Sequence, residues 1–211
     1  MNNQLIDSLI DEVLKRVQKE TGIEIEASGR HVHLNRETID LLFGSGYELT
    51  KLRDLSQPGQ YVCKERVTLI GQKGVIHNVV VLGPARKQTQ VEISQTDAVL
   101  LGIKAPIKES GQLDGTPGIV LSTEKNAVHL NQGVIIAKRH IHMTPEAAKK
   151  NNVVNGEIVQ VKVLGKRPLI FDDVVIRVSL SYETYMHIDY DEANACGFVK
   201  GTIGEIIQNG T

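Results

Sequence analysis

The sequence SGRHVHLNRE at residues 28–37 recurs as AKRHIHMTPE at residues 137–146, and both copies follow the pattern R-H-[VI]-H-[LM]-[NT]-x-E. Alternate side chains of a β-strand lie on the same face, so the two imidazoles of each copy point to one side of an extended segment. Asn35 and Thr144 are typical N-cap residues for a short following helix, and Pro145 suits its first turn. The chain therefore contains a duplicated strand-and-helix unit.

A second correspondence runs without gaps at a constant spacing. Residues 78–81 match residues 173–176, and the segment 92–98 matches 187–193. In this alignment Glu92 corresponds to His187. Each half then offers three candidate metal ligands, which are His31, His33 and Glu92 in the first half and His140, His142 and His187 in the second.

The rest of the pattern predicts a mainly β protein with short helices. Val- and Ile-rich runs separated by turn residues favour small barrels over a doubly wound sheet. We expect tandem small β-barrels of a duplicated unit, with an N-terminal amphipathic helix. The expected division is a helical tail at 1–20, a first barrel half at 21–137 and a second barrel half at 138–211. The pattern is also compatible with strand exchange, in which each His-x-His segment completes the neighbouring barrel.

Residues 2–20 place apolar side chains at helical spacing opposite charged ones, and Thr21-Gly22 is a helix-stop signal. One interpretation is a helix that packs on its own domain or on a dimer partner. The other is a detachable peptide that docks in a groove of another protein. Acidic residues interleaved with basic ones disfavour binding to a membrane surface.

Composition excludes several classes of function. The formal net charge of the 211 residues is −1 and the chain has no basic block, so nothing points to nucleic acid. No apolar run approaches the roughly 18 residues of a membrane span. Cys63 and Cys196 lie far apart and form no CxxC motif, which indicates a reduced intracellular setting, and we expect both side chains in the core.

Two histidines and a third histidine or carboxylate are a ligand set that catalytic zinc sites use, with one coordination position left open. A single His-x-His is weak evidence, because most histidines are ordinary hydrogen-bonding partners. Two copies in the same context, each with a matched third candidate, favour metal binding, with zinc ahead of iron or manganese because imidazole dominates. We expect the two sets to serve one catalytic site. His77 and His129 lack the repeated context and are expected to be ordinary histidines.

Arg86 is the main asymmetry between the halves. It lies in the segment Gly83-Pro84-Ala85-Arg86 shortly before Glu92, and Ser181 is its counterpart. A guanidinium does not bind a cation, but its fork of donors suits an oxyanion such as phosphate. The alternative is an ordinary surface arginine. Arg30 and Arg139, which precede the two His-x-His segments, either orient the ligands or face solvent.

At these residues the sequence resembles the phosphotransacylases of the PduL type, the phosphate propanoyltransferases of bacterial microcompartments. The resemblance spans almost the whole chain. It rests on SGRHVHL at 28–34, GPAR at 83–86, QVEIS at 90–94, KRHIHM at 138–143 and HIDYDEAN at 187–194.

The resemblance implies tandem β-barrels, two Zn²⁺ ions and a homodimer that binds CoA. It also implies transfer of a short acyl group between CoA and phosphate, with propanoyl as the leading candidate. It implies that His31, His33 and Glu92 hold the zinc facing the CoA sulfur, and that Arg86 binds phosphate. His140, His142 and His187 would hold the second zinc. It also implies that residues 1–20 are an encapsulation peptide that contacts shell or core proteins of a microcompartment within the cytoplasm.

Two other classes of function fit the residues alone. A dinuclear zinc thioesterase or hydrolase would use metal-bound hydroxide on a similar scaffold, and would not depend on phosphate. A non-enzymatic, metal-stabilised assembly module would act through its N-terminal helix, and would show no CoA-dependent turnover.

Overall fold

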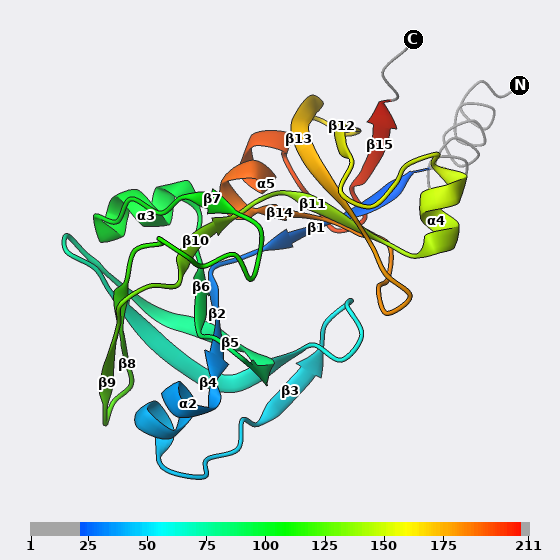
Figure 1. The fold of residues 1–211 in the computed structure, drawn as a ribbon. Coiled ribbons are helices and arrows are strands. Elements are labelled where there is room, and N and C mark those ends of the chain that lie inside the picture. The colour runs from blue at the N-terminus through cyan, green and yellow to red at the C-terminus, as the bar shows by residue number, and fades with distance from the viewer. Residues whose placement is uncertain (1–21, 208–211) are drawn as a thin grey trace, which may run out of the picture. The chain divides into compact units, whose positions relative to one another are not determined.

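The computed structural model describes residues 22–207, which form a mainly β protein with four short helices, as the sequence predicts (Figure 1). The predicted amphipathic tail at 1–20 lies outside the described residues. Among residues 22–207, none of the helices has the length and apolar character that a membrane-spanning helix requires. The described residues divide into two compact units, which are treated separately below.

The first, called the barrel unit, comprises residues 22–27, 139–188 and 192–207. Its six strands close into a barrel in the order β1-β14-β11-β13-β12-β15. These strands are β1 (Ile23–Ser28), β11 (His140–Met143), β12 (Ile158–Val163), β13 (Leu169–Val178), β14 (Tyr185–Asp189) and β15 (Ile203–Ile207). The helices of this part of the chain are α4 (Pro145–Lys150) and α5 (Tyr190–Cys196).

The second, called the sheet unit, comprises residues 28–138 and 189–191. Its nine-stranded sheet has the order β7-β10-β6-β2-β5-β4-β8-β9, with β3 paired to β4 beside this path. The strands are β2 (His31–Asn35), β3 (Lys51–Asp54), β4 (Tyr61–Ile70), β5 (Val75–Arg86), β6 (Gln90–Glu92), β7 (Ile107–Lys108), β8 (Ile119–Ser122), β9 (Ala127–Leu130) and β10 (Val134–Ala137). The helices are α2 (Arg36–Phe43) and α3 (Gln95–Leu101).

The short helices begin where the sequence places capping residues. The Asn35 side chain accepts a hydrogen bond from the Thr38 amide at 2.8 Å at the start of α2. Thr144 does the same for the Ala147 amide at 3.1 Å, with Pro145 in the first turn of α4. Each cap satisfies an amide that the helix itself leaves unpaired. The chain therefore turns directly from each His-x-His strand into a helix.

Two strands are exchanged relative to the order of the repeat. β1 and β10 each precede a His-x-His strand, so by sequence they are equivalent. β1 nevertheless lies in the barrel unit between β14 and β15, whereas β10 lies in the sheet unit between β6 and β7. Figure 1 shows this for the blue strand β1, which lies among the orange and red strands. The compact units place residues 22–27 with the barrel strands and residues 138 and 189–191 with the sheet, whereas the division into halves at 21–137 and 138–211 stays a prediction. The exchanged element is the strand before each His-x-His segment, and not that segment itself.

Each unit has its own apolar core, and the apolar residues that alternate with the histidines in β2 and β11 belong to these cores. Val32 and Leu34 are fully buried in the sheet unit, and Ile141 and Met143 are fully buried in the barrel unit. Cys63 and Cys196 are buried, unpaired thiols in these two cores, as the sequence predicts. The imidazoles, on the opposite face of the same strands, remain available for a site.

Candidate metal centres

Cross-strand register brings each predicted ligand set together. In the sheet unit, β2 runs antiparallel to β6, and His31 lies directly opposite Glu92. In the barrel unit, β11 runs antiparallel to β14, and His140 lies directly opposite His187. Directly opposite residues present their side chains on the same face of a sheet. The two units thus build the same arrangement from strands with matching register, as the repeat predicts.

The first triad consists of His31, His33 and Glu92, whose ligand atoms lie within 4.8 Å of one another. His31 Nε2 is 3.4 Å from Glu92 Oε2, and His33 Nε2 is 3.9 Å from Glu92 Oε1. On the far side of its ring, His31 Nδ1 lies 2.8 Å from the Gly29 carbonyl oxygen, which can only accept a hydrogen bond. Nδ1 therefore carries a hydrogen, and Nε2 is the atom that faces the site.

Burial and the Glu92 charge shape the electrostatics of this triad. Burial lowers the pKa of His31, but the Glu92 carboxylate and the hydrogen bonds to Glu92 and Gly29 outweigh it and leave that pKa raised above 6.5. Burial, followed by the charges of His31 and Arg86, holds the pKa of His33 well below its usual value. Although burial opposes it, the positive charge around Glu92 holds the pKa of that carboxyl well below its usual range. The site therefore favours a positive charge beside the Glu92 carboxylate.

The second triad consists only of imidazoles, and its ligand atoms also lie within 4.8 Å of one another. The ring centroids are 4.7 Å apart for His140 and His142 and 5.0 Å apart for His142 and His187. Glu26 Oε2 on β1 lies 3.8 Å from His187 Nδ1. Burial, with the charges of the neighbouring histidines and Arg177, lowers the pKa of His142 to about 2. The His142 imidazole is therefore neutral at neutral pH, the form that binds a metal ion.

The residues present fit a metal ion at both triads. Nitrogen and oxygen ligands about 2 Å from one tetrahedral ion lie roughly 3.3 Å apart. The first triad is close to this, with 3.4 and 3.9 Å between the imidazole nitrogens and the Glu92 oxygens. In the second triad, the buried His142 Nδ1 has no hydrogen-bond partner among the described residues. In the first, His31 Nε2 faces a carboxylate oxygen, so either a proton or a metal cation must lie between them. Metal-bound imidazoles that donate their second N–H to a backbone carbonyl are a common arrangement, and His31 has it.

The structure places Arg86 near the first triad. It lies at the end of β5, opposite Asn35 of β2, and its charge lowers the pKa values of His31, His33 and Glu92. Its Nη1 donates to Ser110 Oγ at 3.1 Å. Arg86, the predicted anion-binding residue, therefore lies close to the first triad within the sheet unit. That the two triads serve one site stays a prediction.

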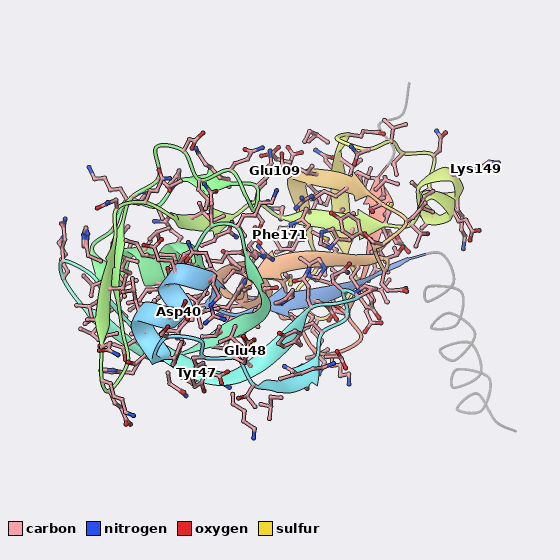
Figure 2. All side chains as sticks on the ribbon, turned by 60° about the horizontal axis from the view of Figure 1, so that its bottom comes forward. Asp40, Tyr47, Glu48, Glu109, Lys149 and Phe171 are labelled. Carbon is pink, nitrogen blue, oxygen red and sulfur yellow. The ribbon has the colours of Figure 1, made fainter. Side chains whose placement is uncertain are left out.

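The two arginines before the His-x-His segments hold helices in place. Arg30 makes a bidentate contact with Asp97 of α3, with distances of 2.9 and 2.8 Å. Arg139 Nε lies 2.6 Å from Glu192 Oε1 of α5, and its guanidinium stacks over Phe171, which is labelled in Figure 2. Asp97 and Glu192 occupy matching positions of the repeat. These contacts are with helix carboxylates and not with the metal ligands, so a role in orienting the ligands stays a prediction.

Several residues at the triads escaped the sequence analysis. Gln90 contacts Glu92 of the first triad, and Ser110 contacts Arg86. The centroid of the Tyr182 ring lies 4.1 Å from that of His142. Arg177 lies opposite His142 on β13. These residues differ between the halves, so the repeat gave no signal for them. The position of Gln90 could have been predicted, because it lies two residues before Glu92 and therefore on the same face of β6.

Comparison with known proteins gives a consistent result over the whole chain. A family model described as phosphate propanoyltransferase matches residues 24–199. The phosphate propanoyltransferase of Listeria monocytogenes is 68% identical over 208 residues, which is 99% of this chain and 98% of the relative. That of Clostridioides difficile is 65% identical, covering 97% of this chain and 98% of the relative. That of Thermotoga maritima is 52% identical, covering 94% of this chain and 95% of the relative.

The raised pKa of His31 predicts how metal binding to the first triad depends on pH. A proton on His31 competes with the metal, so affinity should rise by about tenfold per pH unit below that pKa and level off above it. Competitive chelator titrations between about pH 6 and 8 would measure this. A His187→Ala variant, in which the second triad is incomplete, isolates the first triad, and His31→Ala in that background is the control. An affinity independent of pH across this range would contradict the assignment.

Proposed function

The chain belongs to the phosphate propanoyltransferase family, and from this premise we propose that it transfers a propanoyl group between CoA and phosphate. The observation that carries the proposal is the position of Arg86 beside a triad that fits a metal ion. An anion-binding guanidinium next to a Lewis-acid site is what the attack of phosphate on a thioester requires.

Zinc is the metal that we propose for both triads. Two imidazoles with a carboxylate, and three imidazoles, are ligand sets of catalytic zinc sites, and both leave a coordination position open. When bound, zinc would supply Lewis acidity toward an acyl or phosphate oxygen and an affinity for the CoA sulfur. His31, His33 and Glu92 would hold the ion on the CoA side, and the three histidines of the barrel unit would hold the other.

The proposed reaction is a direct transfer. A phosphate oxygen forms a bond to the thioester carbonyl carbon, and the carbon–sulfur bond breaks with its electron pair going to sulfur. The products are propanoyl phosphate and CoA, whose thiolate takes up a proton from solvent. Arg86 would hold the phosphate dianion and orient one oxygen toward the carbonyl carbon.

An acyl-enzyme on a cysteine is disfavoured by the chain itself. Burial raises the pKa of the Cys63 thiol to about 11, and burial also raises the pKa of Cys196. A protonated, buried thiol is a poor nucleophile, because the thiolate is the reactive form. Both side chains lie in the apolar cores. The two cysteines therefore have structural positions, which supports transfer without a covalent intermediate.

We propose further that the protein is a homodimer located in a bacterial microcompartment within the cytoplasm, with residues 1–20 contacting shell or core proteins. The support is the amphipathic pattern of that segment together with the resemblance described above.

A fusion of residues 1–20 to a fluorescent protein should therefore sediment with the compartment when both are expressed in one cell. A control fusion with Leu9→Glu and Val13→Glu should remain in the supernatant, because the charges interrupt the apolar face. Equal distribution of the two fusions would reject the targeting role.

The transferase proposal predicts that CoA release from propanoyl-CoA depends on phosphate and on metal. In phosphate-free buffer the rate should fall to background, and chelation should abolish it until zinc is restored. Arg86→Ala should raise the KM for phosphate by about a hundredfold, since a charge-assisted bidentate contact is lost, while zinc content stays unchanged.

Two results would reverse the conclusion. CoA release at the same rate without phosphate would indicate the thioesterase, and propanoate rather than propanoyl phosphate would then be the product. Chelation that unfolds the protein, with no turnover of the metal-loaded form under any condition, would indicate the assembly module. Arg36→Ala, at an exposed arginine paired with Asp40, is the matched control for loss of one guanidinium and should leave the kinetics unchanged.

A further inference from the structure

We propose that Gln90 is a positioning residue that couples the metal ligand Glu92 to the anion-binding Arg86 through Ser110. The inference rests on the proposed phosphate site and assigns to that site a residue that does not itself touch substrate. Gln90 lies on β6, opposite His33 of β2, and only 2% of its surface is exposed. A buried amide must have its hydrogen-bonding groups satisfied, so its partners decide what it does.

All the hydrogen-bonding groups of the Gln90 side chain have partners. Its Nε2 donates one hydrogen bond to Glu92 Oε1 and a second to Ser110 Oγ at 2.8 Å. Its Oε1 accepts from the Gly111 amide at 2.8 Å. The opposite orientation of the amide would place its oxygen against the Glu92 carboxylate and leave the Gly111 amide facing an NH₂ group. The network therefore fixes one orientation of the amide.

Ser110 connects this amide to Arg86. Its Oγ accepts from Gln90 Nε2 and also from Arg86 Nη1 at 3.1 Å. Ser110 belongs to the loop that follows β7, next to Glu109, which Figure 2 labels. Holding the Ser110 oxygen therefore holds both this loop and one edge of the guanidinium. Gln90 therefore links Ser110, and through it one edge of the Arg86 guanidinium, to the metal ligand Glu92.

The barrel unit carries different residues at the positions that correspond to Gln90 and Arg86. Tyr185 lies opposite His142 on β14, as Gln90 lies opposite His33 on β6, and Ser181 stands where the first half has Arg86. The glutamine and the arginine of this network therefore occur at the triad that has a carboxylate ligand. This is the expected distribution if its role is to align an anion with the metal, and not to stabilise the duplicated fold.

Kinetics of a Gln90→Leu variant test the proposal. Leucine keeps a similar volume but removes both donors and the acceptor. The KM for phosphate should rise by about tenfold or more, while the KM for propanoyl-CoA and the zinc content remain within about twofold of the wild-type values. Gln112→Leu, at an exposed glutamine of the same loop, is the control and should leave all three unchanged.

A double-mutant cycle separates positioning from a general structural effect. Ser110→Ala should raise the phosphate KM to a similar extent, and Gln90→Leu added to it should raise the KM by less than about twofold, because both act through one contact. Independent effects that multiply in the double variant would overturn the proposal. So would a Gln90→Leu variant with unchanged phosphate KM, or one that loses zinc together with activity.

Ser110 variants keep the test decisive if Gln90→Leu does not fold. Ser110→Thr retains the hydroxyl and should restore most of the phosphate affinity that Ser110→Ala loses; absence of this rescue would overturn the proposal. Phosphate-dependent turnover by the wild-type enzyme is measured in the same assay. Its absence would reject the proposed function, whereas its presence with unaffected variants would reject only the role of Gln90.

Discussion

The alternation of side chains along two short strands is the constraint on which the rest of the structure depends. In β2 and β11 every second residue is buried in a core, and the residues between them are the histidines. Each large apolar side chain in these positions contributes roughly 1.5–3 kcal/mol by burial. A slip of one residue would place imidazoles in the core and expose Val32 or Ile141, so the cores hold the histidines on the site face. Packing energy thereby fixes the geometry of the ligands.

The same frame supports two chemically different centres. The first triad has Glu92 at the position where the second has His187, and the two triads therefore differ in charge. In the first triad the pKa of the Glu92 carboxyl is held low and the pKa of His31 is raised. In the second triad, which has imidazoles only, burial followed by the charges of the neighbouring histidines lowers the pKa of His142. Arg86 is present only beside the first. Duplication preserved the strand register, while divergence of a few side chains assigned each centre its own charge.

Much of the fold and nearly all of the ligand set follow from local sequence. The His-x-His alternation and the caps at Asn35 and Thr144 predicted strands and helices, because they depend on neighbours in the chain. The distant ligands Glu92 and His187 were found through the constant spacing of the repeat. The exchange of β1 and β10 did not follow, since it depends on which sheet edge each strand joins. Gln90 and Ser110 were also missed, because a contact between β6 and a distant loop leaves no periodic signal.

The central claim is that each of the two register-aligned triads holds one metal ion. Anomalous diffraction at the zinc edge, measured from crystals of zinc-loaded protein, tests it most directly. We expect two peaks per chain, one bounded by His31, His33 and Glu92 and the other by His140, His142 and His187. A peak ligated by other residues, or empty triads in crystals whose protein is fully active, would contradict it.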